Sequence, residues 1–199
     1  MNRPPPPAAS RALAETQAWV ERVVIGLNLC PFAKAPQVKG QVRYSVSDAT
    51  DPQALLACLL DELRRLADAA AADIETTLLI HPKVLNDFGD YNDFLDLADR
   101  AVEELGLEGV IQVASFHPHY RFEDTAGDDL GNATNRSPYP TLHLLREDSI
   151  ERAAESFPEA ETIFEANMET MQRLGAEGWE ALQQQCRDDA AAASPPPAP

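Results

Sequence analysis

The chain has few basic residues, few cysteines and no long apolar run. Lys and Arg number 16 against 33 Asp and Glu in 199 residues, so the formal net charge is −17. Nucleic-acid binding by counterion release needs a basic surface, and an anionic membrane surface would repel an acidic protein. We therefore expect neither nucleic acid nor a membrane as a partner, and we expect the acidic excess to favour solubility.

Other absences exclude further classes of protein. Three cysteines without a C-x-x-C spacing are typical of a reducing cytosol and argue against a disulfide framework or a zinc knuckle. No stretch approaches the roughly 18 apolar residues of a membrane span, and the N-terminus lacks the apolar core of a signal peptide. The Gly-rich loops of nucleotide sites and the G-x-S-x-G of serine hydrolases are missing as well. We expect a cytoplasmic protein.

Proline and alanine dominate both ends of the chain. The sequences MNRPPPPAAS and DDAAAASPPPAP contain little apolar surface to bury, which predicts disordered tails over residues 1–9 and 186–199. Residues 10–185 are long enough for one domain with a sizeable core.

Helical and strand periodicities alternate along this domain. Helical patterns cover 10–27, 51–70, 91–105 and, with a break at Pro158, 149–185. Strand patterns cover 41–47, 76–82, 109–116 and 140–147. This order predicts an α/β (or α+β) fold with a single mixed sheet of about four strands, helices mainly on one face and a helical C-terminal part. The last two strands, joined by a loop of over twenty residues, could be antiparallel.

The segment 115–140 is the richest in side chains that can carry chemistry. His117 and His119 follow a predicted strand, and residues two apart on an extended chain point to the same side. Together with a carboxylate such as Asp124 they could bind iron or zinc, because two imidazoles and one carboxylate are a known ligand set for both metals. The alternative is that one histidine caps the strand end while the other lies on the surface.

Arg136 lies among amides and hydroxyls in the same segment. A guanidinium can hold a carboxylate or phosphate by a bidentate contact, and an anionic substrate needs such a local counter-charge in an acidic protein. We therefore expect Asn132, Asn135, Arg136 and Ser137 to bind the substrate. The alternative is a turn whose polar side chains bond their own backbone, with Arg136 paired to a nearby Asp.

Cys30 lies where a helical pattern gives way to a loop. A thiolate there would serve as a nucleophile, a redox centre or a metal ligand, whereas the alternative is a buried structural cysteine. Cys-Pro also occurs at haem-thiolate sites, so haem is a weaker cofactor candidate than iron or zinc. Cys58 is expected in the core, and Cys186 near the C-terminal tail. His81 ends one predicted strand as His117 ends another, and the two could meet at one edge of the sheet; the alternative is a polar strand terminator.

Four motifs of the chain occur together in a known group of proteins. GLNLCPFA, TTLLIHP, SFHPHYRFED and NRSPYP, in this order, make the chain resemble a bacterial family, with members in plants, known only as domain of unknown function 1415. The resemblance spans about residues 19–174. It implies a stand-alone cytosolic domain but no established activity. The signature that it implies includes Cys30, His117, Tyr120, Asn135, Arg136, Ser137 and Pro138.

These observations predict a cytosolic enzyme that acts on a small anionic molecule, with or without a metal, and leave the substrate, the reaction and the oligomeric state open. Cys30, His117 and Tyr120 are the catalytic candidates. Two other classes remain: a non-catalytic binding protein for a metal, haem or metabolite, and a protein-interaction module. Convergence of Cys30, His117 and Arg136 on one concave pocket would favour a ligand site.

Overall fold

A computed structural model describes residues 7–155 and 162–193. The residues 1–6 and 194–199 of the predicted tails, and the predicted break at Pro158, lie outside the described residues. The predicted α/β fold, with a mixed sheet of four strands and a helical C-terminal part, is confirmed.

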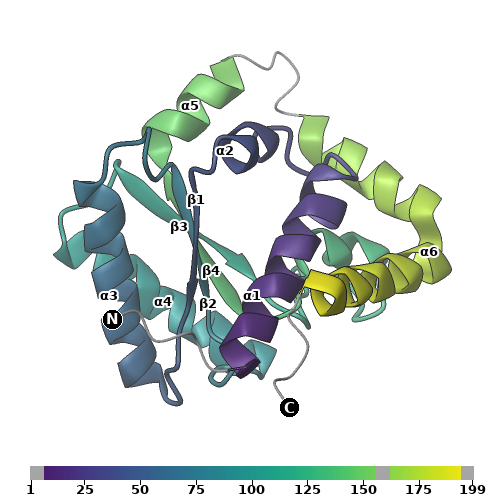
Figure 1. Ribbon diagram of the computed structural model, residues 1–199, viewed down its shortest axis with the longest axis horizontal. Coiled ribbons are helices and arrows are strands. Elements are labelled where there is room, and N and C mark those ends of the chain that lie inside the picture. The colour runs from purple at the N-terminus through teal and green to yellow at the C-terminus, as the bar shows by residue number, and fades with distance from the viewer. Residues whose placement is uncertain (1–6, 156–161, 194–199) are drawn as a thin grey trace.

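The sheet has the strand order β1-β2-β4-β3 (Figure 1). Its strands are β1 (Val42–Val46), β2 (Thr76–Ile80), β3 (Ile111–Phe116) and β4 (Thr141–Arg146). β1 and β2 are parallel, and β4 is antiparallel to both β2 and β3. The carboxyl ends of β1, β2 and β3 therefore lie along one edge of the sheet, beside the amino end of β4.

Two helices cover one face of the sheet: α3 (Pro52–Asp68) and α4 (Phe88–Glu104). The Asp51 carboxylate caps α3 by accepting the Ala54 N–H at 2.9 Å, which satisfies one of the free amides of a helix start. Four leucines at helical spacing are fully buried against the sheet: Leu55, Leu59, Leu63 and Leu66. Burial of each contributes roughly 1.5–3 kcal/mol to stability.

The opposite face is covered by α1 (Pro7–Trp19), a π-helical turn η1 (Val20–Ile25) and α6 (Ile163–Ala193). Figure 1 shows α1 and α6 on the other side of the sheet from α3 and α4. Helices thus cover both faces, whereas the sequence pattern predicts them mainly on one. β2 explains the difference, because Leu78 packs with α1 and α6 while its neighbour Leu79 packs with α3 and α4.

The C-terminal helix corrects the predicted boundary of the domain. α6 continues through residues 186–193, and a non-helical Gly175, with φ at 70°, separates its two helical parts. Cys186 and Ala190 are only 4% and 3% exposed, and Asp189 forms an ion pair with Arg22. These residues pack as part of the fold, so the tail predicted from residue 186 begins too early. At the other end, α1 already includes residues 7–9.

Three short helical segments complete the described fold: α2 (Lys34–Val38), α5 (Glu147–Glu155) and the 3-10 helix η2 (Leu130–Asn135), which lies within the long loop between β3 and β4. No helix in residues 7–155 or 162–193 is both long and apolar enough to cross a membrane.

Candidate functional site

The carboxyl edge of the sheet brings His81 and His117 together, as the repeated His-Pro pattern had suggested. His81 follows β2 and His117 follows β3, and both side chains are fully buried. Tyr91 of α4 joins them, with ring centroids 5.8 Å from His81 and 5.0 Å from His117. The Tyr91 hydroxyl donates to Thr141 O at 2.9 Å and accepts the Phe116 N–H at 3.2 Å, so it ties β3 to β4.

Hydrogen bonds assign the protonation of both histidines. His81 Nδ1 lies 3.0 Å from Val84 O, and His117 Nε2 lies 3.1 Å from Leu85 O. Because a carbonyl only accepts, each of these nitrogens carries the proton. His117 Nδ1 accepts the His119 N–H at 3.0 Å, so both of its ring nitrogens are engaged. His81 Nε2 is buried without a partner among the described residues. Burial lowers the pKa of His81 to about 4 and also lowers the pKa of His117.

Arg136 ties the long loop together. Its Nε donates to Tyr120 O at 3.2 Å and its terminal NH2 donates to Gly127 O at 2.6 Å. Burial lowers the pKa of this guanidinium, and the charge of Asp129 opposes the shift. Arg136 thus bonds the backbone of its own loop, whereas the alternative to substrate binding paired it with a nearby Asp.

The side-chain amide of Asn132 is likewise hydrogen-bonded within the loop. Its Oδ1 accepts from the Phe122 N–H and from the Thr125 hydroxyl, both at 2.9 Å, and its Nδ2 donates to Ala126 O at 2.8 Å. Asn132 is also fully buried. Its amide therefore shapes the loop from within.

Asn135 fastens the loop to the sheet, and Ser137 bonds the backbone of the loop itself. Asn135 Nδ2 donates to Ser115 O at 3.3 Å, and its backbone carbonyl accepts the His117 N–H at 3.2 Å. Ser137 Oγ donates to Tyr139 O at 2.6 Å. The side chains predicted to bind a substrate thus bond backbone groups, and the two Asn side chains also bond the hydroxyls of Thr125 and Thr134.

Cys30 lies apart from this network. Burial raises the pKa of its thiol, which the N–H groups of Phe32 and Ala33 only partly offset. This direction is opposite to that of an activated thiolate. Within the described ranges, Cys30 has no hydrogen bond or ion pair with His117, Tyr120 or Arg136. All three cysteines are free thiols. Cys58 packs partly buried against the core, and Cys186 is buried.

The three proposed metal ligands differ in burial, because His117 is fully buried at the end of β3 while the other two are exposed. The rings of His117 and His119 have centroids 5.8 Å apart, and His119 and Asp124 are exposed. Among residues 7–155 and 162–193, no three His, Cys, Asp or Glu side chains are grouped so that they could hold a metal ion. Iron or zinc at His117, His119 and Asp124 stays a prediction from the sequence, as does haem.

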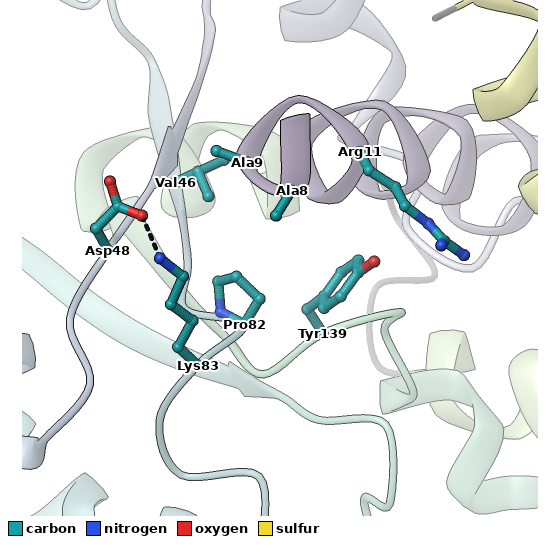
Figure 2. A pocket seen from close by; sticks show the side chains of 8 residues that line it. All are labelled: Ala8, Ala9, Arg11, Val46, Asp48, Pro82, Lys83 and Tyr139. Atoms are coloured by element: carbon teal, nitrogen blue, oxygen red, sulfur yellow. Dashed lines mark hydrogen bonds and ion pairs between the residues drawn. The ribbon is translucent and has the colours of Figure 1, made fainter. Parts of the chain in front are cut away.

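A cavity of about 200 Å³ opens at the carboxyl ends of β1 and β2, next to the first turn of α1. Figure 2 shows an apolar stretch between two charged rims. Val46, Pro82, Ala8, Ala9 and the ring of Tyr139 form the stretch, with Lys83 and Asp48 at one rim and Arg11 at the other. None of the residues predicted to form the site lines this cavity.

Each charged group of the cavity has a partner. Lys83 Nζ lies 2.7 Å from Asp48 Oδ1. Arg11 Nε lies 2.8 Å from Glu15 Oε1, and the Tyr139 hydroxyl donates to Glu15 Oε2 at 2.6 Å. Burial, followed by the Glu15 carboxylate, raises the pKa of Tyr139 to about 12, so this phenol is neutral.

The sequence contained weak signals for the cavity. Lys83 directly follows His81-Pro82, and Tyr139 belongs to the NRSPYP motif, but neither is among the binding residues that the sequence predicts. Arg11 had no local signal, because only the packing of α1 across the sheet brings it to this edge.

Comparison with known proteins identifies the family of the chain and nothing closer. A family model described as "Protein of unknown function (DUF1415)" matches residues 11–181. No curated protein and no solved structure matches the chain.

Proposed function

The chain belongs to the DUF1415 family, and we propose that it binds a small metabolite with an anionic group in the cavity at the carboxyl ends of β1 and β2. One observation carries this proposal: the fold brings Arg11 and Lys83, which lie far apart in the sequence, to the rims of one apolar hollow. In an acidic protein, Arg11 and Lys83 are cations with which an anionic group of the ligand can exchange partners.

The position and size of the cavity support the proposal. Open α/β sheets bind ligands outside the carboxyl ends of their strands. A volume of about 200 Å³ corresponds to roughly seven water-sized groups at about 30 Å³ each, which suits a metabolite of low molecular weight. The apolar stretch along Val46, Pro82 and the ring of Tyr139 would cover the body of such a ligand.

We extend the proposal to an enzyme that acts on this metabolite in the cytoplasm. Tyr139 lines the cavity, and its hydroxyl donates to the buried carboxylate of Glu15. A phenol and a carboxylate joined in this way can give and take a proton. Three free cysteines are typical of a reducing compartment.

In this proposal the loop between β3 and β4 positions Tyr139. The Tyr139 carbonyl accepts from the Ser137 hydroxyl at 2.6 Å and from the Thr141 hydroxyl at 2.9 Å. Arg136 and Asn132 hold the rest of the loop through its carbonyls and amides. The NRSPYP motif would then act through the placement of one tyrosine.

Binding of known small molecules tests the proposal. The protein is titrated by calorimetry with inorganic phosphate, short carboxylates and small amino acids. We expect at least one of these to bind, and Lys83→Gln to weaken its binding by roughly tenfold or more, because a charged contact is lost. Lys39→Gln, an exposed lysine outside the cavity, is the matched control and should bind as wild type does. Absence of binding across the panel, or binding that survives in the Arg11 and Lys83 double variant, would overturn the proposal.

A further inference from the structure

The charges at the cavity cancel. Two cations, Arg11 and Lys83, face two carboxylates, Glu15 and Asp48, in two ion pairs. The protein as a whole carries −17. A ligand that carries only negative charge therefore meets no excess of positive charge in this hollow.

The two ion pairs differ in how easily a ligand can exchange their partners. The Glu15 side chain is only 10% exposed, and both of its oxygens are occupied, by Arg11 and by the Tyr139 hydroxyl. The Asp48 side chain is 65% exposed, and Lys83 is its only side-chain partner in the part of the chain that the structure describes. The rim formed by Asp48 and Lys83 is therefore the one that a ligand can open.

Opening that rim with a single charge is unfavourable. A carboxylate that takes Lys83 lies next to the Asp48 carboxylate, and an amine that takes Asp48 lies next to the Lys83 ammonium, so each single charge meets a like charge at close range. A ligand with both groups replaces both partners at once. The Lys83 ammonium and the Asp48 carboxylate are 2.7 Å apart, so the two charged groups of the ligand must also be neighbours. An ammonium and a carboxylate on the same carbon satisfy this condition.

The lining of the cavity indicates the chemical character of the part of the ligand beyond its charged groups. In the view of Figure 2, Pro82 and the ring of Tyr139 lie beyond this rim, and Ala8, Ala9 and Val46 lie across from them. No polar side chain interrupts the stretch between the two rims among the lining residues. Contact with an apolar group removes its surface from water, whereas a polar side chain would lose its hydration there without a partner.

We infer that the ligand of this cavity is a small α-amino acid with a short apolar side chain. Its carboxylate lies at Lys83, its ammonium lies at Asp48, and its side chain lies against Val46, Pro82 and Tyr139. This inference rests on the proposed function and specifies its ligand class. The pair of Arg11 and Glu15 stays closed and holds the Tyr139 hydroxyl beside the end of the apolar side chain.

Three molecules that share one apolar group test the inference. L-valine carries both charges, 3-methylbutanoate lacks the ammonium, and isobutylamine lacks the carboxylate. Calorimetry with the full chain should detect valine, with each of the other two at least roughly tenfold weaker. If 3-methylbutanoate binds as tightly as valine, the inference is wrong and the proposed function stands. If none of the three binds the folded protein, the inference is wrong as well, and the phosphate and carboxylate arms of the wider panel decide the proposed function separately.

Two variants, each of which removes one charge of the rim, should change which of the three ligands binds best. Asp48→Asn should weaken valine and strengthen 3-methylbutanoate, because Lys83 is freed for a carboxylate. Lys83→Gln should weaken valine and strengthen isobutylamine, because Asp48 is freed for an amine. Asp73→Asn, at an exposed aspartate outside the cavity, is the control and should keep the wild-type order. Both rim positions are exposed, and circular dichroism verifies that each variant is folded. Valine binding that is unchanged in both rim variants would overturn the inference.

Discussion

The side chains of His81 and His117 bind the backbone carbonyls of two consecutive residues. His81 Nδ1 donates to Val84 O at 3.0 Å, and His117 Nε2 donates to Leu85 O at 3.1 Å. Leu85 has a positive φ of 56°, which is an unfavourable backbone conformation for a leucine. Histidines from two strand ends thus hold the loop that presents Lys83 to the cavity.

The first prediction concerns stability in acid. Burial lowers the pKa of His81 to about 4 and also lowers the pKa of His117, so the folded protein resists protonation that the unfolded chain accepts near pH 6.5. The contribution of these neutral histidines to stability is complete above pH 6.5 and is lost as the pH falls toward 4. For His81 the loss is on the order of 3 kcal/mol. Urea unfolding between pH 7.5 and 4 measures it.

A variant at His81 distinguishes the contribution of this histidine to the pH dependence of stability from that of the many carboxylates of the chain. His81→Gln should be less stable than wild type at pH 7.5, because it disturbs the Val84 contact and the stacking on Tyr91. Its free energy of unfolding should then fall less steeply between pH 6.5 and 4. The matched variant His119→Gln, at an exposed ring, should keep the wild-type slope. Equal slopes for His81→Gln and wild type would contradict the prediction.

The second prediction concerns Arg136. Because its guanidinium bonds two loop carbonyls, Arg136→Ala should lower the free energy of unfolding by about 1–3 kcal/mol. Arg136→Lys should recover only part of this loss, because an ammonium lacks the planar fork that reaches both carbonyls. Chemical denaturation measures all three proteins. Arg121→Ala, at an exposed arginine of the same loop, should stay within about 0.5 kcal/mol of wild type; an equal loss there would remove the special role of Arg136.

The third prediction concerns the cysteines. Burial raises the pKa of both Cys30 and Cys186, so each thiol is mainly protonated at neutral pH and shielded from reagents. Alkylation of the native protein, mapped by mass spectrometry, should be slow at both positions and become fast only in denaturant. Rapid selective labelling of Cys30 in the native protein would instead support the nucleophile that the sequence suggested.

The fourth prediction concerns the two halves of the C-terminal segment. Removal of residues 194–199 should leave the melting temperature nearly unchanged. Removal of residues 186–199 should lower it by several degrees, because Cys186, Ala190 and the ion pair of Asp189 with Arg22 are lost from the contact of α6 with α1 and η1. Calorimetry of the two truncated chains makes the comparison, and equal melting temperatures would show that the end of α6 contributes nothing.

Local patterns were sufficient for the four strands and for α3 and α4. Each of the four strands was recognised because alternation or a short apolar run closed by proline is a property of the neighbouring residues themselves. The leucine spacing of α3 is another such local property. The sequence did not indicate that helices cover both faces of the sheet. β2 is buried on both faces, so its side chains do not alternate between apolar and polar, and nothing in the strand itself indicates how many helix layers pack on it.

For the candidate site, too, the local sequence and the tertiary structure give different information. The sequence by itself determined which segments are unusual: the two His-Pro strand ends and the loop of Asn132, Arg136 and Tyr139. Only the tertiary structure decided what those residues do. Polar side chains in a loop can hydrogen-bond either to their own backbone or to a ligand, and the amino-acid sequence of the loop is the same in both cases. The structure directs Arg136 and Asn132 inward to the loop, and it brings Arg11 of α1 to the cavity that contains Lys83. The cavity exists because two distant segments pack across the end of the sheet, and such long-range packing leaves no periodic trace along the chain.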